Sequence, residues 1–109
     1  MKWRCVCGYV HDGEEAPERC PKCGAPKSKF TRIEDQSAEL IDRSRLSNQL
    51  LMGLATLGES LAELGEAGIE DDLDPGCLQT FKLAKKAGIE CMQAAKAEIQ
   101  AHIGKGKWG

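Results

Sequence analysis

Two cysteine pairs near the N-terminus, Cys5-Val6-Cys7-Gly8 and Cys20-Pro21-Lys22-Cys23-Gly24, have twelve residues between Cys7 and Cys20. Two cysteine pairs on tight turns can present four sulfurs to one ion, and a tetrahedral site takes four such ligands at about 2.3 Å. The glycine after each pair permits the left-handed backbone that closes the turn and brings amides near the sulfurs. We therefore predict a four-thiolate metal site made of Cys5, Cys7, Cys20 and Cys23.

The composition limits the classes of protein to consider. The chain has 109 residues, six cysteines and a net charge of −2. It contains no apolar run near the roughly 18 residues of a membrane span, and Met1-Lys2-Trp3-Arg4-Cys5 does not begin a signal peptide. We expect a soluble cytoplasmic protein with no membrane partner, whose reduced thiols favour metal over disulfides.

The balance of charges also indicates whether the protein binds nucleic acid, because binding to the phosphate backbone requires an excess of Lys and Arg side chains. A nucleic-acid-binding zinc ribbon is disfavoured, since several acidic side chains dilute the basic ones beside the cysteines: Asp12, Glu14, Glu15 and Glu18 against Lys22, Lys27 and Lys29. We expect no nucleic-acid partner.

A change of composition near Glu34 divides the chain into two predicted domains. Residues 1–33 hold the four clustered cysteines, three of the four prolines and three of the five aromatic residues. So short a segment cannot build a sufficient core, so we expect the metal to fold it into a small β ribbon. Residues 34–109 have a helical pattern, which makes the chain mainly α overall.

The first predicted helix starts either at Thr31, with Glu34 completing a capping box, or at Ser37. A leucine stripe with helical spacing follows, made of Leu46, Leu50, Leu54, Leu57, Leu61 and Leu64. Leu51 widens this apolar face to roughly 140°. The glycines and acidic residues of segment 65–74 are expected to end the helix.

The second predicted helix starts at Asp74 as the cap and Pro75 as the first helical residue. Its apolar stripe consists of Leu78, Phe81, Ala84, Gly88, Cys91, Met92, Ala95 and Ile99. The small members of this stripe would let a leucine-rich neighbour approach closely, and a connection of about nine residues favours an antiparallel hairpin.

Two helices cannot cover so wide an apolar face. We therefore expect two chains to pair their hairpins into a four-helix bundle, a homodimer formed through the helices. The alternative is that the hairpin folds back on the N-terminal module.

The N-terminal residues resemble a known family. Trp3-Arg4-Cys5, Cys7-Gly8-Tyr9-Val10-His11, Glu15-Ala16-Pro17-Glu18, Cys20-Pro21-Lys22-Cys23-Gly24-Ala25-Pro26 and Phe30 are similar to the rubredoxin-like domain of rubrerythrins. The resemblance covers residues 1–33. It implies one iron ion held by Cys5, Cys7, Cys20 and Cys23, which cycles between ferrous and ferric states, above a small aromatic core of Trp3, Tyr9 and Phe30. It also implies one-electron transfer to redox partner proteins, such as oxidative-stress enzymes.

The first cysteine pair departs from the family pattern, because one residue separates Cys5 from Cys7 where the family has two. The shorter turn removes or redirects an amide–sulfur contact, which leaves zinc open beside iron. His11 is a fallback ligand if Cys5 cannot reach the ion. The alternative function is a structural zinc ribbon that supports a helical module for protein interaction or dimerisation.

A second departure concerns catalysis. Rubrerythrins resemble peroxidases through a di-iron site built from glutamates and Glu-x-x-His motifs on four helices. No Glu-x-x-His occurs in this sequence, and Glu98 and His102 are one residue too far apart. We therefore expect no enzyme and no catalytic residues.

The remaining histidine and cysteines have ordinary structural interpretations. We expect His102 to be a buried or flanking residue of the second helix. Cys77 and Cys91 lie about 21 Å apart on one helix and cannot bridge within a chain. Small core cysteines are the default for both, and a redox-sensing or intersubunit role is the alternative.

Overall fold

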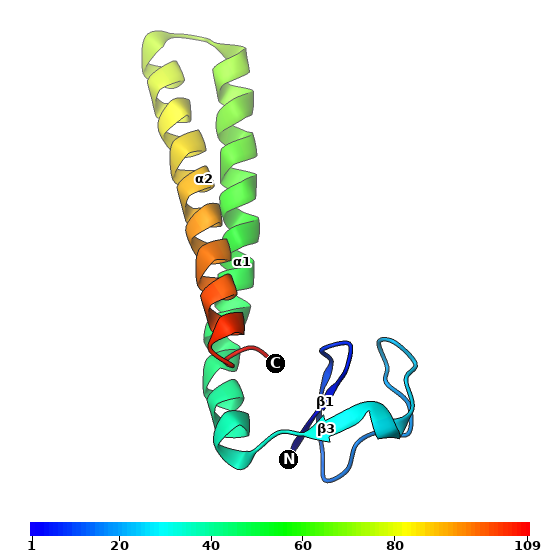
Figure 1. The fold of residues 1–109 in the computed structure, drawn as a ribbon. Coiled ribbons are helices and arrows are strands. Elements are labelled where there is room, and N and C mark those ends of the chain that lie inside the picture. Colours follow the sequence, from blue (N-terminus) through cyan, green and yellow to red (C-terminus); the bar gives the residue numbers. More distant parts are fainter. The chain divides into compact units, whose positions relative to one another are not determined.

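The computed structural model describes residues 1–109, in the order β1 (Lys2–Cys5), β2 (Val10–Asp12), a short 3-10 helix η1 (Lys27–Lys29), β3 (Phe30–Arg32), α1 (Asp35–Asp71) and α2 (Pro75–Gly104). The predicted class, a small β ribbon followed by an antiparallel helical hairpin, is confirmed (Figure 1). Neither helix is long and apolar enough to cross a membrane.

Two compact units make up the chain. One contains Met1–Arg45 together with Lys105–Gly109, and the other contains Leu46–Gly104. The first unit therefore includes the opening turns of α1 and the C-terminal tail. The division into domains at residues 1–33 and 34–109 stays a prediction.

The sheet of the first unit has β1 at its centre, with β2 and β3 antiparallel on either side. Its small core is built from Cys5, Ala16, Cys20 and Phe30, against which Trp3, Cys7, Tyr9 and Ala25 pack. The expected aromatic core of Trp3, Tyr9 and Phe30 is therefore present. Because two of its four buried residues are predicted metal ligands, this core and the metal site are one structure.

A cluster of charges joins the start of α1 to the sheet within this unit. The buried Lys2 ammonium lies 2.7 Å from carboxylate oxygens of both Asp12 and Asp42. The Arg45 guanidinium donates to both oxygens of Asp12, at 2.5 and 3.0 Å. Hydrogen bonds from Arg45 and Lys2 hold the pKa of Asp12 well below its usual range. Lys2 is thereby compensated for its burial, as a buried ammonium must be.

The C-terminal tail also docks on the first unit. Arg4 donates to the carbonyl of Trp108 at 3.2 Å, and Arg45 donates to the carbonyl of Gly109 at 2.8 Å. A Cβ on Gly109 would meet Ile41 at 3.0 Å and Val10 at 3.2 Å. The tail is thus packed against the sheet and the first turns of α1.

The ends of the helices agree only partly with the sequence prediction. Thr31 lies in β3, so α1 begins at Asp35 and not at Thr31 or Ser37. The helix also continues through Gly65 to Asp71, which leaves residues 72–74 as the connection instead of about nine residues. The start of α2 is as predicted, since the Asp74 carboxylate accepts the Cys77 N–H at 2.7 Å.

Gly65 and Gly68 sit in the helix for a packing reason. A Cβ on Gly68 would lie 2.1 Å from the Phe81 ring, and one on Gly65 would lie 2.7 Å from the Phe81 carbonyl oxygen. These glycines make room for α2 and do not end α1. Their helix-breaking tendency of about 1 kcal/mol each is outweighed by tertiary packing.

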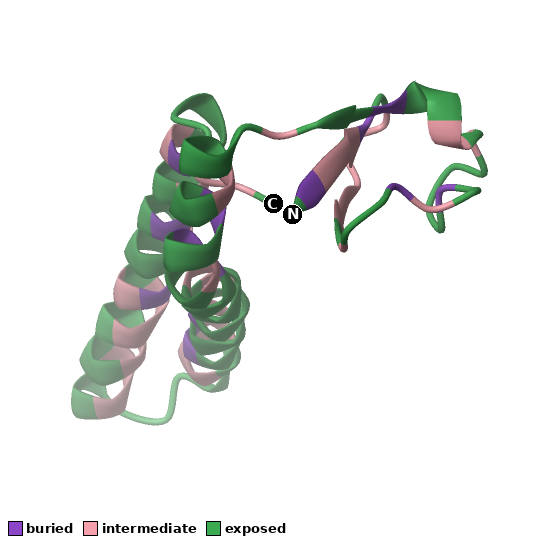
Figure 2. Cartoon of the chain, turned by 90° about the horizontal axis from the view of Figure 1, so that it is seen from below, coloured by how far each residue is buried: buried purple, intermediate pink, exposed green.

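The contact between α1 and α2 is formed by small residues on both helices. A Cβ on Gly58 would lie 2.7 Å from the Gly88 carbonyl oxygen, and one on Gly88 would lie 2.5 Å from the Ala62 nitrogen. The buried and half-buried positions of α1 recur with heptad spacing at Asn48, Leu51, Ala55, Gly58, Ala62, Gly65 and Ile69. Figure 2 shows buried and intermediate positions along both helices, with exposed residues over the rest of their surface.

The expectation that the leucine stripe of α1 packs on the small residues of α2 is therefore wrong. All six leucines of that stripe are exposed, by 37% to 69%. The small residues of α2 face small residues of α1, because two backbones that approach closely leave no room for leucine between them. In α2 the predicted stripe is correct except for Cys91, which is exposed.

Candidate metal centre

Two tight turns, one after β1 and one at Cys20, carry the four clustered cysteines. In the first turn the Gly8 N–H donates to the Cys5 carbonyl at 2.9 Å, and in the second the Gly24 N–H donates to the Cys20 carbonyl at 2.9 Å. Both glycines have the predicted left-handed backbone, with φ of +98° at Gly8 and +75° at Gly24. A side chain there would strain the turn, so glycine is what the geometry requires.

The four sulfurs converge as the sequence predicts. The Sγ atoms of Cys5, Cys7, Cys20 and Cys23 all lie within 4.8 Å of one another. Cys5 Sγ is 3.6 Å from Cys23 Sγ, and Cys7 Sγ is 3.7 Å from Cys20 Sγ. Four ligands at about 2.3 Å around a tetrahedral ion stand about 3.8 Å apart. The spacing therefore fits one tetrahedral ion, and all six cysteines are free of disulfides.

The two turns differ in the backbone groups they offer to sulfur. Burial raises the pKa of Cys20, but the N–H groups of Cys23 and Lys22 and the neighbouring thiols lower it to about 6. The N–H of Cys7 lowers the pKa of Cys5, yet burial and three neighbouring thiols raise it to about 12. Two amides thus favour the thiolate at Cys20 and one at Cys5, as expected of the missing residue in the first turn.

A further contact orients the first turn. The Val6 N–H donates to the Lys29 carbonyl at 3.2 Å, and the Cys5 N–H donates to the Tyr9 carbonyl at 2.9 Å. The shortened turn is therefore anchored to the end of η1 as well as to the sheet. Sequence reasoning missed Lys29, because a backbone carbonyl has no signature in the side-chain pattern.

One side of the site is buried and the other reaches the surface. Cys5 and Cys20 are 2% and 3% exposed, whereas Cys7 is half-buried and Cys23 is exposed. Val6, between the first two ligands, is 77% exposed. An ion held here would lie directly beneath the surface of the domain.

The other predicted ligands and reactive groups lie elsewhere. His11 is paired with Trp3 across β1 and β2, and its ring is not among the ligand atoms that converge. Cys77 is half-buried and Cys91 is exposed, so the expectation of a core cysteine is wrong for Cys91. Its position on the outer side of α2 leaves the thiol open to solvent.

His102 is buried in the helical hairpin, as predicted. Its Nδ1 lies 2.5 Å from the side-chain oxygen of Asn48, and its Nε2 lies 3.3 Å from a carboxylate oxygen of Glu98. Both ring nitrogens therefore have a partner, and His102 forms a polar contact between α1 and α2.

The comparisons with known proteins point to the same segment. Residues 3–31 match the family model of the rubrerythrin rubredoxin-like domain. A stretch of 46 residues is 46% identical to reverse rubrerythrin-1 of Clostridium acetobutylicum and covers 41% of this chain and 25% of that protein. Another of 30 residues is 63% identical to rubrerythrin of Nitratidesulfovibrio vulgaris and covers 27% of this chain and 16% of that protein.

The similarity thus spans a quarter or less of these relatives' own length. No solved structure matches the chain significantly. The four converging cysteines lie inside the matched segment, and the hairpin begins after it. Residues 3–31 of this chain are therefore similar to the rubredoxin-like domain of rubrerythrins, they bring together four cysteines that could hold one metal ion, and a helical hairpin follows them.

Proposed function

We propose that the protein is a one-electron carrier that holds a single iron ion between Cys5, Cys7, Cys20 and Cys23. The observation that supports this most is the convergence of four sulfurs at tetrahedral spacing within a segment that matches the rubredoxin-like domain. Iron bound there would alternate between its ferrous and ferric states. Redox partner proteins, such as enzymes that reduce peroxide or oxygen, would exchange electrons with it.

The residues around the site suit this role. Four thiolates leave no open coordination position, so the site holds an ion without binding substrate. Amides of Cys7, Lys22 and Cys23 stabilise negative charge on the sulfurs, which tunes the relative stability of the two oxidation states. The exposed Cys23 and Val6 bring the site within reach of a partner protein. A reducing compartment such as the cytoplasm would keep the thiols available.

The proposal is tested by metal analysis, visible absorption and voltammetry of the full chain purified from its native source. We expect about one iron per chain, thiolate-to-iron absorption and a reversible one-electron wave. Cys7→Ser should remove or strongly alter the absorption. Cys91→Ser should leave it unchanged, because that exposed thiol lies outside the site. A colourless protein that holds one zinc from iron-replete cells would contradict the iron assignment.

The second candidate is a structural zinc ribbon whose metal only folds the N-terminal unit. The exposed leucine stripe of α1 favours it, because this stripe gives the helices a binding surface of their own. In that case exchange of zinc for iron would leave the association of the helices unchanged. The same purified protein would show stoichiometric zinc and no reversible wave.

A further inference from the structure

The exposed leucines of α1 form a second helical seam. Leu50, Leu54, Leu57, Leu61 and Leu64 follow the 4-3-4-3 spacing of helix-to-helix packing, and Leu46 extends the row by one turn. This seam lies about 100° around the helix from the glycine and alanine seam that contacts α2. In a four-helix bundle each helix touches two neighbours about 90° apart. The second seam therefore calls for another helix.

A stripe of small residues lies on the same side of the hairpin. A groove beside the leucines is lined by Leu50 and Leu54 from α1 and by Glu98 from α2, which identifies the side of α2 that adjoins them. Helical spacing from Glu98 runs through alanines and cysteines with few interruptions: Cys77, Ala84, Ala87, Cys91, Ala94 and Ala101. One side of the hairpin thus carries the leucine row of α1 next to a row of small side chains on α2, which we call the small row.

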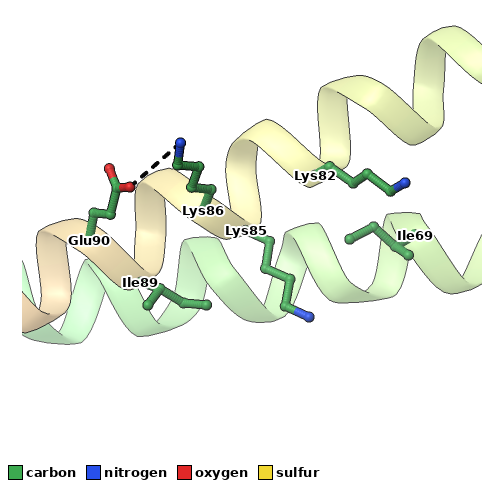
Figure 3. Close-up of a pocket in the computed structure, with 6 residues that line it drawn as sticks. All are labelled: Ile69, Lys82, Lys85, Lys86, Ile89 and Glu90. Atoms are coloured by element: carbon green, nitrogen blue, oxygen red, sulfur yellow. Dashed lines mark ion pairs between the residues drawn. The ribbon is translucent and has the colours of Figure 1, made fainter.

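The opposite side of the hairpin is different in character. Its groove is lined by Lys82, Lys85 and Lys86 with Ile69, Ile89 and Glu90, and Figure 3 shows the three lysines and the pair between Lys86 and Glu90. Lys85 also pairs with Glu66 of α1. Charged groups of this density disfavour burial in an apolar interface. Only the leucine side is suited to cover by another helix pair.

We propose that a second copy of this chain covers the leucine side, with the two-fold axis parallel to the helices. That symmetry sets the leucine row of α1 in one chain against the small row of α2 in the other. The same contact occurs at two places in the dimer, and at each place leucine side chains occupy the space beside small side chains. Every neighbouring helix pair is then antiparallel, as in an up-and-down bundle.

The size of the surface agrees with this occupant. The row from Leu46 to Leu64 is about 27 Å long, and the hairpin is about 20 Å wide. The face therefore has a projected area on the order of 500 Å². Because side chains protrude from it, its accessible area is larger than its projected area and approaches the roughly 800 Å² that each partner buries in a specific interface. The proposal does not depend on which metal the N-terminal unit holds.

Sedimentation equilibrium of the metal-loaded full chain tests the proposal. The wild-type protein should be a dimer at micromolar concentration, and Leu57→Glu should weaken the dimer at least 100-fold. Thr56→Glu, one residue along on another face of the helix, should leave it unchanged. A wild-type monomer at 100 micromolar, or a Leu57→Glu protein that dimerises normally, overturns the proposal.

A second pair of variants tests how the rows meet. Ala94→Glu, in the small row of α2, should break the dimer, whereas Ala97→Glu, at an exposed position outside that row, should not. A silent Ala94→Glu would overturn the arrangement, because leucine rows packed on each other would leave this residue free. Circular dichroism checks that each variant stays helical.

A measurement on the unmodified protein avoids variants altogether. The exposed Cys91 lies in the small row, so its alkylation, followed by peptide mass spectrometry, should slow as the protein concentration rises through the dimer range. A rate that is independent of concentration counts against the proposed interface.

Discussion

The close approach of α1 and α2 makes Gly88→Ala a sharp test of the hairpin. A Cβ at this position would lie 2.5 Å from both the Ala62 nitrogen and the Gly58 carbonyl oxygen, which are backbone atoms that cannot rotate away. To regain ordinary contact the helices must separate by nearly 1 Å. Gly53 is the matched control, because it lies in α1 and a Cβ there would meet nothing within 4 Å.

Two opposing effects determine the magnitude. Alanine favours the helix over glycine by about 1 kcal/mol at either position. Overpacking against backbone costs about 1–3 kcal/mol, and the contacts at Gly88 place it in the upper part of that range. We expect Gly88→Ala to lower the free energy of unfolding by about 1–2 kcal/mol and Gly53→Ala to raise it by up to about 1 kcal/mol.

Thermal unfolding of the metal-loaded chain at one fixed protein concentration, followed by far-ultraviolet circular dichroism, measures both variants. At about 4–8 °C per kcal/mol for a domain of this size, Gly88→Ala should melt about 5–10 °C lower and Gly53→Ala a few degrees higher. The opposite signs matter more than the sizes. If Gly88→Ala stabilises the protein as Gly53→Ala does, the helices do not meet through this glycine and the packing argument fails.

The remaining predictions concern the first unit and the cap of α2. Insertion of one residue between Val6 and Cys7 should add an amide donor to the first turn and raise the potential of the iron form, because such donors favour the more negative ferrous centre; voltammetry showing no rise would contradict this. Removal of the metal by a chelator should abolish the near-ultraviolet circular dichroism of the N-terminal aromatic core but keep most of the helical signal, and a retained near-ultraviolet spectrum would mean that the unit folds without metal. Asp12→Asn should lower the free energy of unfolding by about 1 kcal/mol, and the loss is modest because the carboxylate is half-exposed. A urea titration that detected no change would contradict the role of the charge cluster. Asp74→Ala should lower the midpoint of the same titration through loss of the cap of α2, whereas Asp74→Asn should retain most of the stability.

The metal site could be predicted from sequence because its information is local. Each pair of cysteines and its glycine lie within a few residues, so the turn and the direction of the sulfurs follow from short-range geometry. The cap at Asp74 is equally local. The charge cluster of Lys2, Asp12, Asp42 and Arg45 has no such pattern, since it joins a sheet to a helix that is distant in sequence.

For the helices, the sequence pattern predicts the apolar faces, and the packing of the folded chain selects which of these faces meet. Periodicity established that α1 has an apolar leucine face and that α2 has a stripe of small residues. The periodicity did not predict which face of α1 meets α2. From sequence, a glycine such as Gly58 only lowers the helix propensity, and its role in packing depends on the backbone of α2 that lies against it. Two helix backbones can approach closely only where side chains are small or absent, and only the tertiary structure shows at which positions the two helices make this contact. The leucines are left outside for the same reason.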